Sequence, residues 1–339
     1  MEEKKKTARE IIEGYDGPPV RIMEVCGTHT HEIFRLGIRK LLPEQVELIS
    51  GPGCPVCVTQ VGFIDEAIYL ALERQVTICT FGDLVRVPGT NMSLAGARER
   101  GAKIRIVYSP VDAKEYAKEH PKEQVTFLSV GFETTTPSAC LSVKKAREEG
   151  LTNYSILTAN KTMPQAYEAL KGSADIFLYP GHVNAITGTK LCEELAKEGV
   201  SGVVAGFTAK ELLTALAVAL ARFQEGRPFF VNCYPRVVTE NGSPQAQKLV
   251  EEMMEPCDSE WRGLGVIKGS GMRLQEEWSA FDARKKYKIP LIQGKANPAC
   301  RCGDVLQGKC KPSDCKVFGK VCTPQHPIGA CMVSGEGAC

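Results

Sequence analysis

Short apolar runs alternate with amphipathic stretches along the first two-thirds of the chain. Eight runs rich in Val and Ile predict strands, at residues 20–25, 46–50, 76–81, 103–108, 125–130, 154–159, 175–180 and 202–207. Most of these runs are apolar at consecutive positions, which is typical of strands covered on both faces of a parallel sheet. Helical patterns lie between them, for example over residues 61–75 and 209–226. Repeated strand–helix units of this kind predict a doubly wound α/β fold.

The same pattern predicts how the chain divides. A polar stretch near residue 120 favours two α/β units, over residues 20–120 and 121–224, rather than one eight-stranded sheet. After residue 225 the pattern gives a short strand, a turn and a helix, and from residue 293 onward Gly, Pro, Lys and Cys dominate. Residues 225–339 are therefore expected to form a third unit that orders around a metal or disulfides. A helix is expected over residues 1–14, and it could pack on this third unit.

Reactive side chains follow five of the predicted strands. They lie in Gly-rich or Pro-rich loops at residues 26–31, 51–57, 82–89, 131–137 and 181–184. Ligands of open α/β sheets bind at the carboxyl ends of the strands. The five loops therefore predict one cleft.

Composition excludes several classes of protein. A net charge of +2 over 339 residues gives no electrostatic reason to expect binding to nucleic acid or membranes. The N-terminal stretch lacks the apolar core of a signal peptide, and no apolar run is long enough to span a membrane, so a cytoplasmic protein is expected. The P-loop, G-x-G-x-x-G, H-E-x-x-H and C-x₃-C-x₂-C motifs are all missing from the sequence.

Cysteine is the unusual component, because the chain has fifteen and seven of them lie in residues 300–339. Stable disulfides are rare in the cytosol, so metal binding or redox chemistry is the better interpretation. Cys54 and Cys57 form a Cys-x-x-Cys pair between a predicted strand and a predicted helix. A helix N-terminus favours a thiolate, and two thiols at this spacing can store two electrons as a disulfide. Half of a zinc site, or two packed thiols, is the alternative.

The loop at 26–31 reads Cys-Gly-Thr-His-Thr-His, with a soft thiol and two imidazoles. This combination favours a ligand or acid–base role. His29 is the better candidate of the two histidines, because His31 could simply open the next helix.

Four further polar residues stand in the strand-end loops, and each has a simpler alternative. Glu133 could cap a helix, Asp83 and Arg86 could form a surface ion pair, and His182 could be a turn residue. Their shared position at strand ends is what makes them candidates for the cleft.

The C-terminal cysteines are spaced for no familiar cluster or zinc motif. They are Cys300, Cys302, Cys310, Cys315, Cys322, Cys331 and Cys339. Four thiolates are the usual ligand set of an iron–sulfur cluster, and a structural zinc site is the alternative. More than four thiols favour a cluster with a neighbouring dithiol.

Longer motifs define a resemblance to a known family. CGTHTH, SGPGCPVCVT, FGDLVRVPG, SVGFETTTP, YPGHVNAITG and the cysteine-rich ending follow one another over residues 26–339. Together they resemble the hydrogenase maturation protein HypD family. The resemblance implies two α/β domains that face a cleft, and a third domain with a [4Fe-4S] cluster, in agreement with the division above.

The resemblance also implies a function, which is assembly of the Fe(CN)₂CO group of [NiFe] hydrogenases. It implies HypC as partner, and cyanide from HypE with HypF upstream. By position, Cys26 would bind the iron together with HypC, and Cys54 and Cys57 would lie near that iron. The cluster ligands would be Cys300, Cys315, Cys322 and Cys339. Cys302 and Cys331 would form a redox dithiol beside the cluster, as in ferredoxin:thioredoxin reductase, and Cys310 would be incidental.

These implied roles make one electron route. Electrons would pass from the cluster to the Cys302/Cys331 pair, then to the Cys54/Cys57 pair, and then to the iron. Asp83, Arg86, Glu133 and His182 would line the cleft, where they bind cyanide or move protons. The protein is thus expected to be a metallocentre-assembly scaffold with redox activity rather than a conventional enzyme. The alternatives are a stand-alone dithiol–disulfide reductase and a non-catalytic module with structural zinc.

Overall fold

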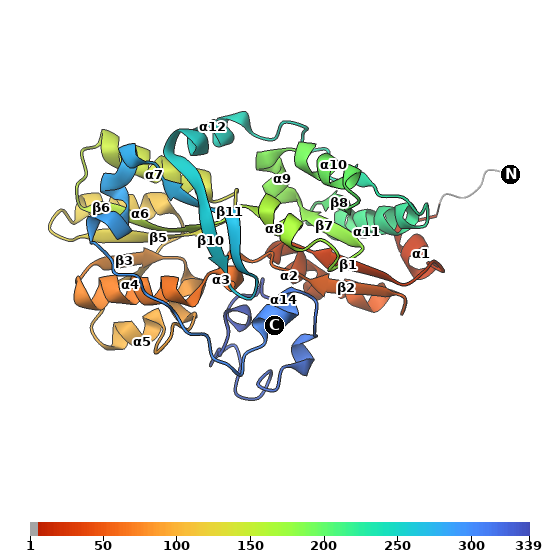
Figure 1. Cartoon of the computed structure of the whole chain (residues 1–339), viewed down its shortest axis with the longest axis horizontal. Coiled ribbons are helices and arrows are strands. Elements are labelled where there is room, and N and C mark those ends of the chain that lie inside the picture. The colour runs from red at the N-terminus through yellow and green to blue at the C-terminus, as the bar shows by residue number, and fades with distance from the viewer. Residues whose placement is uncertain (1–5) are drawn as a thin grey trace.

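The computed structural model describes residues 6–339 and contains two parallel sheets with helices on both faces (Figure 1). The strand order is β2-β1-β7-β8-β9 in the first sheet and β4-β3-β5-β6 in the second. All eight predicted strands are present, and the expected α/β class is confirmed. These eight are β1 Val20–Glu24, β2 Val46–Ser50, β3 Thr77–Thr80, β4 Ile104–Ile106, β5 Val125–Gly131, β6 Tyr154–Asn160, β7 Ile176–Pro180 and β8 Ser201–Ala205, and the short β9 Phe230–Asn232 completes the first sheet.

Helices cover the first sheet on two sides. One face packs on α1 (Ala8–Glu13), α2 (Gly27–Arg35), the 3₁₀ helix η1 (Ile38–Leu41) and α11 (Ala209–Phe223). The other face packs on α8 (Met163–Ala169), α9 (Gly181–Thr187) and α10 (Lys190–Lys197). This second core also contains Cys54, Cys57, Cys302 and Cys331, so the thiols of interest lie against the first sheet.

The second sheet is covered in the same way. Helices α4 (Val61–Glu73) and α5 (Leu94–Glu99) lie on one face. Helices α6 (Pro110–Glu119), α7 (Thr136–Glu148) and α12 (Pro244–Met253) lie on the other. The remaining short helices are α3 Pro55–Val58, η2 Gly82–Arg86, η3 Glu276–Phe281, α13 Ala283–Lys286, α14 Cys302–Leu306, η4 Pro312–Asp314 and η5 Ala330–Met332.

The two sheets are interleaved along the chain, which differs from the predicted division. Strands β1 and β2 belong to the first sheet, β3 to β6 form the second, and β7 to β9 return to the first. The expected boundary between residues 120 and 121 does not separate the sheets, because β3 and β5 pair across it with Thr77 opposite Val125. Hydrophobic periodicity shows that a strand exists but not which strand it pairs with.

Residues 254–274, for which the sequence predicts no strand, form an antiparallel hairpin of β10 (Met254–Trp261) and β11 (Gly265–Leu274). Its tip reaches α3 and α14 (Figure 1), where Arg262 donates its backbone N–H to the Val58 carbonyl. Burial alternates along β10 with a period of two residues. Because of this alternation, β10 has no continuous apolar run of the kind that predicted the other strands.

The predicted N-terminal helix is observed as α1, and residues 1–5 of the expected range lie outside the described residues. Ile12 of α1 packs into the core of the first sheet with Leu216 of α11, and from residues 225–339 this core includes only Phe229, Val231 and Cys233, which lie in or beside β9. Within residues 6–339, no helix is long and apolar enough to cross a membrane. Residues 293–339, which we call the C-terminal segment, contain only short helices and loops.

Candidate functional site

Four of the five predicted strand-end loops meet at one small pocket of about 220 Å³, which we call the Cys26 pocket. The loops after β1, β2, β5 and β7 contribute to its wall, and Glu336 of the C-terminal segment completes it. The lining residues that carry the argument are Cys26, Thr28, Gly53, Thr134, His182 and Glu336. The loop at 82–89 is not part of this wall. The carboxyl ends of the β1 and β7 strands of the first sheet therefore meet the end of β5 from the second sheet here.

Cys26 lies at the N-terminus of α2, in extended backbone conformation immediately before the helix. Burial raises the pKa of the Cys26 thiol to about 12, although the backbone N–H groups of His29 and Thr28 oppose the rise. The thiol is therefore protonated at neutral pH when no metal is present. A soft metal ion that binds here displaces the proton, and the helix N-terminus then stabilises the thiolate.

Two glycines let the Cys26 loop approach the Cys-x-x-Cys loop. A Cβ atom on Gly53 would overlap the backbone of Cys26, and one on Gly27 would lie 3.2 Å from Cys54 Cβ. The Gly27 N–H also donates to the Gly53 carbonyl at 2.9 Å. These motif glycines thus bring Cys26 and Cys54 to the same place.

Cys54 and Cys57 occupy the first turn of α3. The backbone N–H of Cys57 donates to Cys54 Sγ at 3.4 Å, and both residues are buried. The pKa of Cys57 is raised well above its ordinary value: contact with Cys331 lowers it, but contact with Cys54 and burial outweigh that effect. The fifteen cysteines all lie within the described residues, and each is a free thiol.

The contact between Cys57 and Cys331 joins two motifs that are far apart in the sequence. Cys331 also contacts the thiols of Cys302 and Cys339, and Cys302 Sγ lies 3.2 Å from Cys300 Sγ. Hydrogen bonds from Cys300 and Cys331 lower the pKa of Cys302, which makes it the thiol most easily ionised in the group. We call this continuous set the sulfur row, and its members are Cys54, Cys57, Cys331, Cys302, Cys300 and Cys339.

Cys315 and Cys322 lie beside the sulfur row in one tight loop. Cys315 Sγ lies 3.8 Å from the Ala299 carbonyl, next to Cys300 in the sequence, and Cys322 Sγ accepts the N–H of Ile328 at 3.3 Å. A Cβ atom on Gly329 would overlap the sulfurs of Cys300 and Cys302.

Cys300, Cys315, Cys322 and Cys339 have the donor chemistry of a four-thiolate cofactor site. The donors are soft and at least partly buried, one accepts a backbone N–H, and a glycine without a side chain faces them. A single metal ion is a different case: among residues 6–339, no three Cys, His, Asp or Glu side chains surround one point closely enough to hold it.

His29 is held away from the pocket wall. It is fully buried, and its Nε2 lies 3.2 and 3.1 Å from the carbonyls of Ala205 and Gly206, so this nitrogen carries the proton. Burial lowers the pKa of His29 to about 4, so the ring is neutral at pH 7. Its Nδ1 has no hydrogen-bond partner within the described chain. In this structure His29 therefore joins α2 to the end of β8 through these two hydrogen bonds.

His182 and Glu133 are placed differently from one another. His182 lines the Cys26 pocket and stacks on Phe207, with ring centroids 3.8 Å apart. Glu133 lies behind the wall, where Oε1 accepts the Met163 N–H at 2.8 Å and Oε2 has no partner in residues 6–339. Burial raises the pKa of Glu133 to about 7, so it can hold or release a proton near neutrality.

Asp83 and Arg86 lie on η2, outside the pocket wall. Arg86 donates to the carbonyls of Pro324 (2.8 Å) and Val333 (2.9 Å), so it fastens the C-terminal segment to the second sheet. The sequence placed both residues in a cleft because their loop follows a strand, but this loop turns toward the C-terminal segment instead.

Two residues of the site carried no signal in the sequence analysis. Glu336 reaches the pocket from the C-terminal segment and accepts a hydrogen bond from Thr28 Oγ1 at 2.8 Å. Arg262 lies in the unpredicted hairpin. Glu336 stands between two glycines and three residues before Cys339, and this placement inside a cysteine-rich motif is the one sequence feature that could have singled it out.

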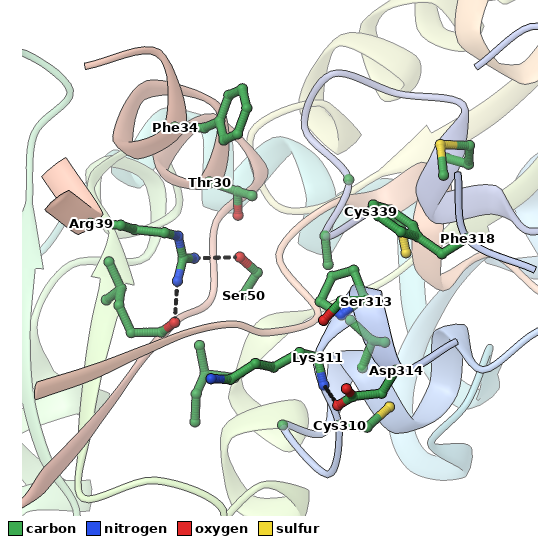
Figure 2. A pocket seen from close by; sticks show the side chains of 18 of the residues that line it. Thr30, Phe34, Arg39, Ser50, Cys310, Lys311, Ser313, Asp314, Phe318 and Cys339 are labelled. Carbon is green, nitrogen blue, oxygen red and sulfur yellow. Dashed lines mark hydrogen bonds between the residues drawn. The ribbon is translucent and has the colours of Figure 1, made fainter. Parts of the chain in front are cut away.

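A larger cavity of about 960 Å³ separates α2, η1 and β2 from the C-terminal segment (Figure 2). Phe34, Thr30 and Arg39 stand on one side of it, and Lys311 and Asp314 on the other. Arg39 donates to Ser50 Oγ at 2.9 Å and to the buried Glu24 at 3.1 Å. Cys339 and Cys310 both line the cavity, so one end of the sulfur row opens into it.

Comparison with known proteins now decides the family. The chain matches the family model "HypD: Hydrogenase formation hypA family" over residues 2–339. The chain belongs to the HypD family. It is 42% identical over 340 residues to "Hydrogenase maturation factor HypD" of Cupriavidus necator, with 96% of this chain and 90% of that protein covered.

Two further relatives carry the same name. The Escherichia coli protein is 43% identical over 329 residues and the Rhizobium leguminosarum protein is 43% identical over 351 residues. The first comparison covers 95% of this chain and 88% of the relative, and the second covers 99% and 91%. The predicted resemblance to the HypD family is thus confirmed.

Proposed function

We propose that this chain is a hydrogenase maturation factor on which a ferrous ion acquires its cyanide and CO ligands at Cys26. Membership of the HypD family and the names of its relatives support this role. A ferrous ion that carries cyanide and CO is the cargo, and a soft thiolate donor suits it. The pocket at Cys26 has a volume of about 220 Å³, which is room for a small metal complex.

The sulfur row is the observation that carries the redox part of the proposal. Cys300, Cys315, Cys322 and Cys339 would hold a resident [4Fe-4S] cluster, which supplies electrons one at a time when bound. Cys302 and Cys331 lie among these residues and would store two electrons as a dithiol.

The contacts define a balanced exchange between the two pairs. Cys331 thiolate attacks Cys57 of a Cys54–Cys57 disulfide, and Cys54 leaves as a thiolate. Cys302 then attacks Cys331, which releases Cys57 and leaves a Cys302–Cys331 disulfide. Two electrons pass to the Cys54/Cys57 pair, and the C-terminal pair loses two protons while the other gains two. Cys302 is suited to the second attack because its pKa is lowered by Cys300 and Cys331.

The same geometry suggests how partners take part. Cys26 supplies a single thiolate, and a cysteine of HypC would supply the second. His182 stands at the pocket wall, where its ring can donate a hydrogen bond to cyanide delivered by HypE, and Glu336 in the same wall accepts a hydrogen bond from Thr28. Glu133 would hold a proton in reserve behind that wall.

A stand-alone dithiol–disulfide reductase fits the geometry less well. Such an enzyme must present its thiol to a protein substrate, whereas the exposed fractions of Cys54 and Cys57 are only 3% and 0%. Burial instead suits exchange between thiols of the same molecule. A zinc module would leave the separate Cys26 pocket without a role.

Infrared spectroscopy after anaerobic co-purification with HypC tests the proposal. The wild-type complex is expected to show nitrile and carbonyl stretches, and Cys26→Ala is expected to lose them while it keeps the iron and sulfide of the cluster. Cys233→Ala, at a half-buried thiol outside the site, is the matched control. Bands that persist in Cys26→Ala would remove Cys26 as the iron ligand.

A further inference from the structure

The tip of the hairpin touches both thiol-bearing helices. Arg262 donates its backbone N–H to Val58 at 2.8 Å and its Nε–H to Thr59 at 2.9 Å, so it holds the C-terminal end of α3. Gly263, the next residue, lies directly on Gly303 of α14, and Gln307 of α14 donates to its carbonyl at 2.5 Å. Helix α3 carries Cys57 and α14 begins at Cys302.

The hairpin that carries this tip is itself fixed. Lys161 at the end of β6 is buried, and its Nζ donates to Ser259 Oγ at 2.6 Å and to the Glu260 carbonyl at 2.7 Å. The indole of Trp261 is fully buried and donates to Ser270 Oγ at 2.8 Å. The tip is therefore a rigid part, and its position sets the separation of the two helices.

Arg262 also keeps one donor unused. Its Nη2 is buried and has no partner among residues 6–339. An unpaired buried donor is costly, so an acceptor is expected close by.

We propose that Arg262 is a positioning residue that, together with Gly263, clamps α3 against α14, so that Cys57 of α3 and Cys302 of α14 both lie against Cys331. This inference rests on the proposed electron hand-over between the two thiol pairs. It assigns to the β10–β11 hairpin a task beyond packing, because two consecutive residues at its tip touch α3 and α14.

Controlled oxidation of the full-length, anaerobically purified protein tests the clamp. In a glutathione buffer, Cys57 and Cys331 lose two protons and two electrons to glutathione disulfide, which becomes two glutathione molecules. The Cys57–Cys331 disulfide is measured by alkylation, digestion and mass spectrometry. Arg262→Met is expected to slow its formation by about tenfold, because small misplacements of reacting atoms cost at least that much.

Three further variants distinguish loss of the clamp from a general loss of stability. Arg262→Lys keeps the charge and one donor and is expected to recover part of the rate. Arg273→Met is the matched control, because Arg273 lies on the same hairpin but is exposed and pairs only with Glu255. Gly263→Ala leaves Arg262 intact but pushes the tip away from Gly303, and it is expected to slow the reaction as Arg262→Met does.

Each outcome of these experiments either supports or overturns the clamp. Equal rates for the wild type and Arg262→Met, with Arg262→Met folded by circular dichroism, overturn the clamp. If the wild type itself forms no Cys57–Cys331 disulfide, the hand-over fails, and the clamp is judged by native alkylation of the two buried thiols. Faster alkylation in Arg262→Met but not in Arg262→Lys then supports the clamp, and equal alkylation overturns it.

Discussion

At the scale of single residues, burial raises the pKa of the thiols, so their reactivity depends on the groups that they contact. Cys57 and Cys331 are fully buried, and the pKa of each is raised well above that of a free thiol. Both thiols are therefore expected to react slowly with a reagent from solution. They touch one another, however, and Cys331 touches the more acidic Cys302, so exchange within the molecule is the reaction that this arrangement favours.

Cys57→Ala tests that role at one atom. The variant is expected to keep full iron and sulfide content but to lose hydrogenase maturation, because the thiol in contact with Cys331 is gone. Cys140→Ala, a fully buried thiol in α7, is the control with the same loss of packing. Both substitutions should lower the free energy of unfolding by about 1 kcal/mol. Normal maturation with Cys57→Ala would remove this thiol from the mechanism.

His29 gives a prediction for pH dependence. Its pKa is about 4 in the folded protein because of burial, so the unfolded chain binds a proton more readily below pH 6.5. Stability from this group is therefore complete above pH 6.5 and is lost as the pH falls to 4, by about 3 kcal/mol. His29→Gln can still donate to Ala205 and Gly206 but does not titrate. Urea unfolding at several pH values should give a flatter profile for the variant, and identical profiles would contradict this role.

At the scale of elements, glycines in short motifs allow two backbone segments to lie in direct contact. Gly27 and Gly53 bring the Cys26 loop onto the loop before α3, and Gly263 meets Gly303 in the same manner. The sequence did reveal the strands and the loops after them, because their apolar runs and glycines are local signals. It did not reveal the hairpin, whose charged, half-exposed β10 lacks a continuous apolar run.

Gly329→Ala probes the backbone next to the sulfurs. A methyl group there would overlap the sulfurs of Cys300 and Cys302, so the variant is expected to lose about tenfold or more of its affinity for the cluster. Iron and sulfide analysis after reconstitution measures the effect, and the melting temperature reports on the α/β fold. Gly335→Ala is the matched control, because its nearest contact would be an ordinary 3.5 Å from His31. Equal cluster content in the two variants would show that Gly329 does not shape the site.

At the scale of the whole molecule, function depends on segments that are distant in sequence. The C-terminal segment crosses the end of the first sheet, where Glu336 lines the Cys26 pocket and accepts a hydrogen bond from Thr28, and Arg86 fastens the segment to the second sheet. Residue types at strand ends predicted the membership of the Cys26 pocket for four loops of five. The fifth loop, at residues 82–89, lies elsewhere because η2 faces the C-terminal segment. Its path, like the pairing of the strands, depends on tertiary contacts that the local sequence does not show.

The exchange between the two thiol pairs is the central claim, and one measurement addresses it directly. Protein with an oxidised Cys54–Cys57 pair is reconstituted with its cluster and reduced with dithionite without oxygen, and free thiols are counted by alkylation and mass spectrometry. The account predicts that the wild type regains both thiols, whereas Cys331→Ser bleaches its cluster normally but leaves Cys54 and Cys57 oxidised. Reduction of that pair at the wild-type rate in Cys331→Ser would contradict it.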